Sequence, residues 1–269
     1  MVWMVVPGVL VLAGAALLVG GVQRAIVFPA TRAMAWSPAE AGWDYVDVFL
    51  SVDGHTTHGW CIPASQSRGV ILYSHGNGGN ISGRMGGIAI WRDLGFDVFI
   101  YDYGGYGNST GKPSEKRCYQ DIRACWRWLV EEQGIPPERI VLFGRSLGGA
   151  VAADLAAEVT PGAVILESTF TSAVTLGKEA FPFLPVGLLL RHRFETEDKL
   201  ARFTAPLLVV HSPDDDIVPY HHGKALFERA PEPKTFLEIG GGHNDGFSET
   251  GEPYVQGLRR FLDPLFPAN

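Results

Sequence analysis

Short apolar runs alternate with longer amphipathic stretches from residue 69 onward. The apolar runs predict buried strands at residues 70–73, 96–101, 139–143, 163–166, 207–211 and 235–239. Between them, apolar residues at helical spacing predict helices at residues 84–94, 114–132, 147–158, 220–229 and 253–262. Continuous apolar strands separated by helices are typical of a parallel sheet with helices on both faces. The pattern therefore predicts an α/β fold with a mostly parallel central sheet, in one domain over residues 29–269.

A hairpin precedes this alternation. Residues 45–52 and 57–62 predict two strands on either side of an Asp53-Gly54 turn. Asp-Gly is typical of the tight turns that join antiparallel strands. We therefore expect an antiparallel pair at the start of the sheet.

The first 23 residues contain no Asp, Glu, Lys, Arg or His. As a helix they would span about 35 Å, enough to cross a hydrocarbon core of ~30 Å. A cleaved signal peptide would need basic residues before the apolar run, whereas the first ones here, Arg24 and Arg32, follow it. We expect a membrane anchor over residues 1–28, with the remaining domain on the cytoplasmic side by the positive-inside rule. The alternative is a buried N-terminal core helix.

One segment, residues 169–203, interrupts the alternation because it contains no strand-like run. Its apolar residues are more numerous than one buried helical stripe needs; they include Phe181, Phe183, Leu184 and Leu188. We expect a lid-like insertion over a pocket, or a surface that contacts lipid. The alternative is an ordinary crossover helix with a hydrophobic underside.

Composition excludes several function classes. The chain has 269 residues, with 22 Lys and Arg against 29 Asp and Glu, so its net charge of −7 gives no basic field for a nucleic acid partner. The three cysteines show no C-x-x-C spacing, which argues against a disulfide framework or a zinc site. Cys118 and Cys125 share helical spacing with Ile122 and are predicted to be core residues. We predict no metal and no cofactor.

The pattern G-x-S-x-G occurs twice, at residues 107–111 and 144–148. Only the second follows a predicted strand directly and begins a helix of small residues. A serine nucleophile at such a strand-to-helix turn needs glycines two residues to either side, here Gly144 and Gly148. We therefore predict Ser146 as a nucleophile and Ser109 as a loop residue.

A serine hydroxyl becomes a good nucleophile when a histidine takes its proton and a carboxylate orients that histidine. At this kind of turn the chain order is serine, acid, histidine. His243 follows three glycines after the strand at 235–239 and is the predicted base. The acid is expected after the strand at 207–211, where the residues alone leave Asp214, Asp215 and Asp216 as alternatives.

An oxyanion requires backbone N–H donors. One donor is expected at Leu147, directly after the nucleophile, and the second in the loop at residues 75–79, which is rich in glycine. His75 stands before that turn and is expected to pack structurally. Three other histidines are predicted to be surface or capping residues: His192, His221 and His222.

With these residues assigned, the sequence resembles the α/β-hydrolase superfamily, above all the membrane-anchored serine hydrolases that include lipases, esterases and protein depalmitoylases. The resemblance rests on ordered motifs: Y-S-H-G-N-G-G-N, Y-D-Y-G-G-Y-G-N-S-T-G-K-P-S-E, F-G-R-S-L-G-G-A-V-A, E-S-T-F-T-S, H-S-P-D-D-D-I-V-P and G-G-G-H-N-D. It implies Ser146 as nucleophile, His243 as base and Asp215 as acid. It also implies Asn77 as the second oxyanion donor. Ser212 departs from the glycine that is usual in the family.

These observations predict a membrane-anchored serine hydrolase that cleaves a carboxylic ester or thioester through an acyl-serine. The apolar segment and the anchor favour a lipid or acylated small molecule as substrate and the lipid bilayer as partner. Two alternatives stay open: a peptidase or amidase with the same triad, and a catalytically silent membrane scaffold.

Overall fold

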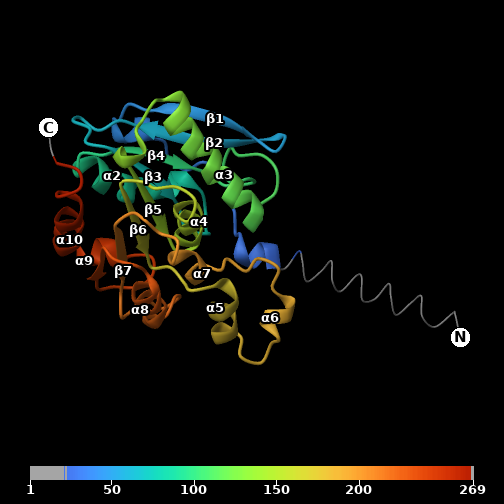
Figure 1. The fold of residues 1–269 in the computed structure, drawn as a ribbon. Coiled ribbons are helices and arrows are strands. Elements are labelled where there is room, and N and C mark those ends of the chain that lie inside the picture. The colour runs from blue at the N-terminus through green and yellow to red at the C-terminus, as the bar shows by residue number, and fades with distance from the viewer. Residues whose placement is uncertain (1–20, 22, 268–269) are drawn as a thin grey trace, which may run out of the picture.

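A computed structural model describes residues 21 and 23–267, and an eight-stranded sheet forms its centre (Figure 1). The strand order is β1-β2-β4-β3-β5-β6-β7-β8. The strands are β1 (Val46–Val52), β2 (His55–Ile62), β3 (Val70–Ser74), β4 (Asp97–Tyr101), β5 (Ile140–Arg145), β6 (Ala163–Glu167), β7 (Leu207–His211) and β8 (Lys234–Glu238). Strand β2 pairs antiparallel with both β1 and β4, whereas β4 and all later neighbours pair in parallel. The predicted hairpin and the mostly parallel sheet are confirmed.

Helices cover both faces of the sheet, as the apolar strands require. They are α2 (Met85–Asp93), α3 (Glu115–Arg127), α4 (Leu147–Ala156), α5 (Ala173–Ala180), α6 (Val186–Leu189), α7 (Glu197–Leu200), α8 (Tyr220–Arg229), α9 (Gly246–Thr250) and α10 (Glu252–Leu262). Shorter turns are η2 (Pro38–Ala41), η3 (Ile81–Arg84), η4 (Trp128–Glu132) and η5 (Pro137–Arg139). The helix predicted at 114–132 is thus α3 followed by the π-helical turn η4.

Two hydrophobic clusters lie on the two faces. In β3, Leu72 belongs to the cluster under α3, α4 and α8, whereas Ile71 belongs to the cluster under α2 and α10. This alternation follows from the two-residue period of a strand. Cys118 and Cys125 of α3 are fully buried in the first cluster, as predicted. The two covered faces leave the carboxyl ends of the strands free for a site.

Most of the predicted anchor, residues 1–20 and 22, lies outside the described residues, so the anchor stays a prediction. Among residues 21 and 23–267, no helix has the length and hydropathy needed to span a bilayer. The described end of this segment packs against the domain. The Gln23 side chain donates a hydrogen bond to the carbonyl of Leu189 (2.7 Å), and the Phe28 ring lies 5.0 Å from that of His192.

The segment between β6 and β7 contains α5, α6 and α7 and no strand. Figure 1 shows α5 and α6 extending away from the sheet, beside the blue N-terminal segment. Two of its side chains are almost entirely exposed, Phe183 at 98% and Leu188 at 89%. An insertion that leaves large apolar side chains in solvent differs from a crossover helix that buries its hydrophobic stripe.

Candidate active site

Ser146 lies at the sharp turn between β5 and α4. Its φ of 54° and ψ of −121° place an L-residue in a disfavoured backbone region. Three hydrogen bonds hold this conformation. Its N–H donates to the carbonyl of Glu167 (2.9 Å), and its own carbonyl accepts from the Gly149 N–H (2.9 Å) and the Thr169 hydroxyl (2.7 Å). The turn therefore presents the serine side chain in a fixed direction above the sheet.

Gly144 and Gly148 are required by close backbone approach. A Cβ at Gly144 would overlap the carbonyl oxygen of Gly148, and a Cβ at Gly148 would overlap that of Ser74. The turn can thus form only where both side chains are absent. Ser109, in the other G-x-S-x-G, lies in a loop, where its hydroxyl donates to the Asp102 carbonyl at 2.7 Å.

The structure brings Ser146, His243 and Asp215 together, although up to 97 residues separate them along the chain. Ser146 Oγ lies 3.0 Å from His243 Nε2. His243 Nδ1 lies 2.9 Å from Asp215 Oδ2 and 3.0 Å from Oδ1. All three side chains are buried. They come from the carboxyl ends of β5, β7 and β8, which is where open α/β sheets bind ligands.

Of the three adjacent aspartates, only Asp215 contacts the imidazole. Asp216 accepts a hydrogen bond from the backbone N–H of His243 (3.0 Å), and Asp214 is exposed. Burial by itself would raise the pKa of Asp215, but hydrogen bonds from His243 and from the N–H groups of Val218 and Ile217 outweigh it and lower the pKa. Asp215 is therefore ionised at neutral pH, so His243 Nδ1 carries a proton and Nε2 faces Ser146 as an acceptor.

Arg145 is a residue that the sequence argument missed. Its guanidinium donates to the carbonyl of His243 (2.6 Å), and its Nε lies 3.3 Å from a carboxylate oxygen of buried Glu167. The other oxygen of Glu167 accepts from the Tyr254 hydroxyl (2.6 Å), and the guanidinium lies 4.8 Å from the Phe247 ring centre. This network ties the turn that carries His243 to β5 and β6. The sequence did hold one signal for Arg145, because it is a charged residue inside the G-x-S-x-G motif.

The two predicted oxyanion donors line the same cavity as Ser146. Among the described residues, no protein acceptor receives a hydrogen bond from the N–H of Asn77 or of Leu147. The carbonyl of Asn77 accepts from the Tyr106 hydroxyl (2.8 Å), which fixes the loop. His75 is fully buried, with Nδ1 2.7 Å from the Gly76 carbonyl, so it packs in the interior as expected.

The prediction for His222 was wrong. This residue is fully buried, and its Nδ1 lies 2.9 Å from the Thr171 hydroxyl. Consecutive residues of a helix point about 100° apart, so the first turn of α8 leaves His221 exposed and turns His222 inward. His192 is half-buried against Phe28.

A cavity of about 820 Å³ opens beside Ser146 and His243. Of the four residues predicted for a lid, Phe181 and Leu184 line this cavity, whereas Phe183 and Leu188 do not and face solvent. The described N-terminal segment contributes Ile26 and Val27. Further apolar side chains of the lining include Phe170, Leu176, Val186, Leu189, Leu190 and Phe194. Polar residues of the lining include Gln23, Asn77, Arg84, Arg145 and Asn244.

The fold and the turn around Ser146 define the class of protein. The chain belongs to the α/β-hydrolase superfamily. A family model described as "Serine aminopeptidase, S33" matches residues 65–188.

Several relatives match most of the chain. Alpha/beta hydrolase domain-containing protein 17C of Mus musculus is 35% identical over 86% of this chain and 72% of its own length. An uncharacterized protein of Mycobacterium tuberculosis is 37% identical over 89% of this chain and 86% of its own. Among solved structures, an esterase of Pyrococcus furiosus superposes with a TM-score of 0.75 at 19% identity, covering 88% of this chain and 96% of that one.

We expect Gly148→Ala to disrupt the turn, because its Cβ would overlap the backbone of Ser74. Overpacking of this kind costs about 3 kcal/mol in the free energy of unfolding, measurable by denaturant titration. Gly83→Ala is the matched control, since a Cβ there meets nothing within 4 Å. A Gly148→Ala variant as stable as Gly83→Ala would contradict the assignment of close approach.

We expect Arg145→Met to lower kcat on the order of 100-fold, since the turn that carries His243 loses its tether. It also destabilises the fold, because buried Glu167 loses a charged partner. The double variant Arg145→Met/Glu167→Gln removes that charge and should restore stability without restoring kcat. Kinetics and thermal unfolding of both variants separate the two effects. Recovery of kcat together with stability would show that Arg145 has a structural role alone.

Proposed function

We propose that this protein is a serine hydrolase, anchored to a membrane through residues 1–28, that cleaves a carboxylic ester or thioester of a lipid or acylated substrate. The observation that carries the proposal is the 3.0 Å contact of Ser146 Oγ with His243 Nε2 at the edge of an apolar cavity of about 820 Å³. That volume lies within the range of small-molecule sites.

In the first half of the proposed reaction, Ser146 Oγ attacks the acyl carbon while His243 Nε2 takes the hydroxyl proton. Asp215 stabilises the imidazolium that forms. The N–H groups of Leu147 and Asn77 donate to the oxyanion, and the partial positive charge at the start of α4 favours it further. The tetrahedral intermediate then collapses, and the leaving alcohol or thiol takes its proton from His243 Nε2.

In the second half, water attacks the acyl-serine while His243 again takes a proton. The bond between Ser146 Oγ and the acyl carbon breaks, the proton returns to Oγ, and the carboxylic acid is released. These steps transfer protons and electron pairs without any change of oxidation state. The proposal therefore includes no cofactor.

The lining of the cavity supports an acyl substrate. Most of the side chains that line it are apolar, Phe181 and Leu184 among them, and such a lining suits an acyl chain. The exposed side chains of Phe183 and Leu188 lie on the same segment. Large apolar side chains on a surface indicate contact with a partner or membrane, which suits a substrate that arrives from the bilayer.

A peptidase or amidase is the second candidate, because the matching family model is described as a serine aminopeptidase. An aminopeptidase must bind a cationic amino terminus, which calls for a carboxylate in the pocket. None of the described residues that line the cavity is Asp or Glu, whereas Arg84 and Arg145 are both present. The charge of the lining therefore favours an ester or thioester.

We expect a fluorophosphonate probe to label the wild-type chain and to leave Ser146→Ala unlabelled, because only an activated serine attacks phosphorus at a useful rate. Labelling is read by fluorescence in a gel. Ser109→Ala, the serine of the other G-x-S-x-G, is the control and should retain full labelling. Absence of labelling in folded wild-type chain would support a catalytically silent scaffold instead.

We expect Leu184→Gln to lower kcat/KM for a hexadecanoyl thioester about tenfold and to leave a butanoyl thioester almost unchanged. The variant removes apolar surface that only the long chain reaches, and burying such a side chain is worth ~1.5 kcal/mol or more. Phe183→Gln, outside the cavity, is the control. It should lower kcat/KM only for a substrate that is dispersed in vesicles. An equal loss on both thioesters would contradict an acyl site at Leu184.

A further inference from the structure

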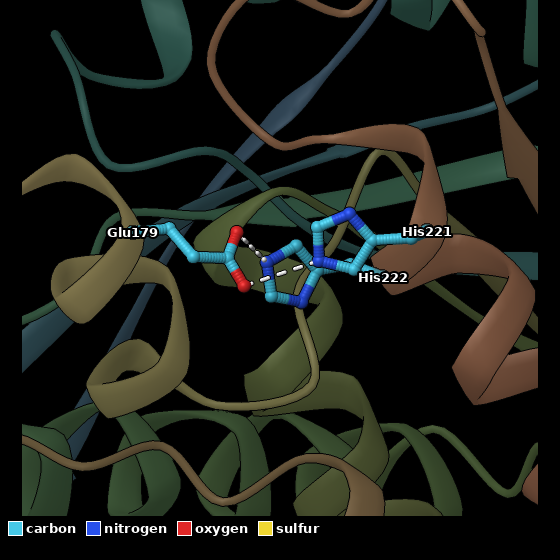
Figure 2. Close-up of side chains that lie close together, drawn as sticks. All are labelled: Glu179, His221 and His222. Atoms are coloured by element: carbon cyan, nitrogen blue, oxygen red, sulfur yellow. Dashed lines mark hydrogen bonds and ion pairs between the residues drawn. The ribbon is translucent and has the colours of Figure 1, made fainter.

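Three potential metal ligands meet on the side of the molecule where α5 and α8 approach each other. Glu179 lies near the end of α5, and His221 and His222 begin α8. Figure 2 shows both imidazoles facing the carboxylate of Glu179. His221 Nε2 lies 3.1 Å from Glu179 Oε1, and His222 Nε2 lies 3.3 Å from Oε2. One ligand atom from each residue lies within 4.8 Å of the others.

These separations suit a tetrahedral ion. Zinc bonds to imidazole nitrogen and carboxylate oxygen are about 2.0–2.2 Å long, which places neighbouring ligand atoms roughly 3.3 Å apart in a tetrahedron. Two histidines and one glutamate are also a common zinc donor set that leaves a fourth position for water. The half-exposed side chains of Glu179 and His221 give an ion a path from solvent.

The state of His222 is a second, independent observation. Its side chain is fully buried, yet Nε2 makes no hydrogen bond among the described residues and points at Glu179. A buried polar atom without a hydrogen bond is costly. A metal ion would satisfy it.

The other ring nitrogen of His222, Nδ1, already has hydrogen-bond partners. His222 Nδ1 lies 2.9 Å from the Thr171 hydroxyl and 3.3 Å from the Thr171 N–H. In this structure Nδ1 accepts from the Thr171 N–H, so zinc binding requires the other tautomer, in which Nδ1 donates to the Thr171 hydroxyl and the lone pair of Nε2 faces the ion.

We propose that Glu179, His221 and His222 bind one zinc ion. The ion joins the end of α5, which lines the cavity, to the start of α8. Phe181, which lines the cavity, follows α5 by one residue, and Asp215 lies in the loop that leads to α8. The bound ion therefore fixes the segment over the acyl site relative to the loop of the acid. It has no contact with Ser146 and takes no part in acyl transfer.

The test is calorimetric titration of the tag-free full chain with zinc chloride, together with thermal unfolding. We expect one zinc per chain and a higher Tm in its presence. Glu179→Gln and His221→Gln each remove one ligand at a half-exposed position and should weaken zinc binding at least tenfold. His55→Gln, at another exposed histidine, is the matched control and should bind zinc like the wild type.

The same titration in the Ser146→Ala background separates this proposal from the enzymatic one, because zinc binding should be retained when labelling is lost. Two results would overturn the zinc site. One is a chain that binds no zinc, in which case Glu179 is only a hydrogen-bond partner of His221 and an ion-pair partner of His222. The other is zinc affinity that Glu179→Gln and His221→Gln both leave unchanged.

Discussion

The structure depends on the close packing of α4 against the ends of β3 and β5. This contact lets the chain turn so sharply at Ser146 that its backbone adopts a positive φ. Such a conformation persists only where the surroundings determine it fully. Here the absence of side chains at Gly144 and Gly148 permits the approach, and the bonds to Glu167 and Thr169 hold it. A core of small residues in α4 is thus the physical condition for a serine that points out of the sheet.

A second constraint acts on the imidazole. A histidine on a glycine-rich loop has backbone freedom, and that freedom must be removed before its nitrogen can meet Ser146. Three polar contacts do this from different directions. Asp215 holds the ring, Asp216 holds the N–H of His243, and Arg145 holds its carbonyl. The loop is therefore positioned by side chains that belong to β5 and to the loop after β7, whose own places are fixed by the sheet.

Local patterns predicted the fold and two of the three side chains that meet, Ser146 and His243, because strand periodicity, the Asp53-Gly54 turn and the glycines around Ser146 are each encoded within a few residues. Contacts between residues that lie far apart in the sequence were harder to predict. The residues alone left three aspartates open, since only the fold decides which of them reaches His243. His222 was assigned to the surface because helical spacing does not say which way α8 is turned. Arg145 was missed because its partners, Glu167 and the carbonyl of His243, come from distant loops.

The segment between β6 and β7 places its apolar side chains differently from the core. The core elements bury their apolar residues against the sheet, whereas this segment divides them between the cavity and solvent: Leu184 lines the cavity and Phe183 does not. Elements outside the sheet hold this segment. Gln23 donates to the Leu189 carbonyl, and the Glu115 carboxylate of α3 accepts from the N–H groups of Arg193 and Phe194. Glu179 faces the two histidines of α8. The shape of the cavity is therefore set by these peripheral contacts, and the geometry of Ser146, His243 and Asp215 by the rigid sheet.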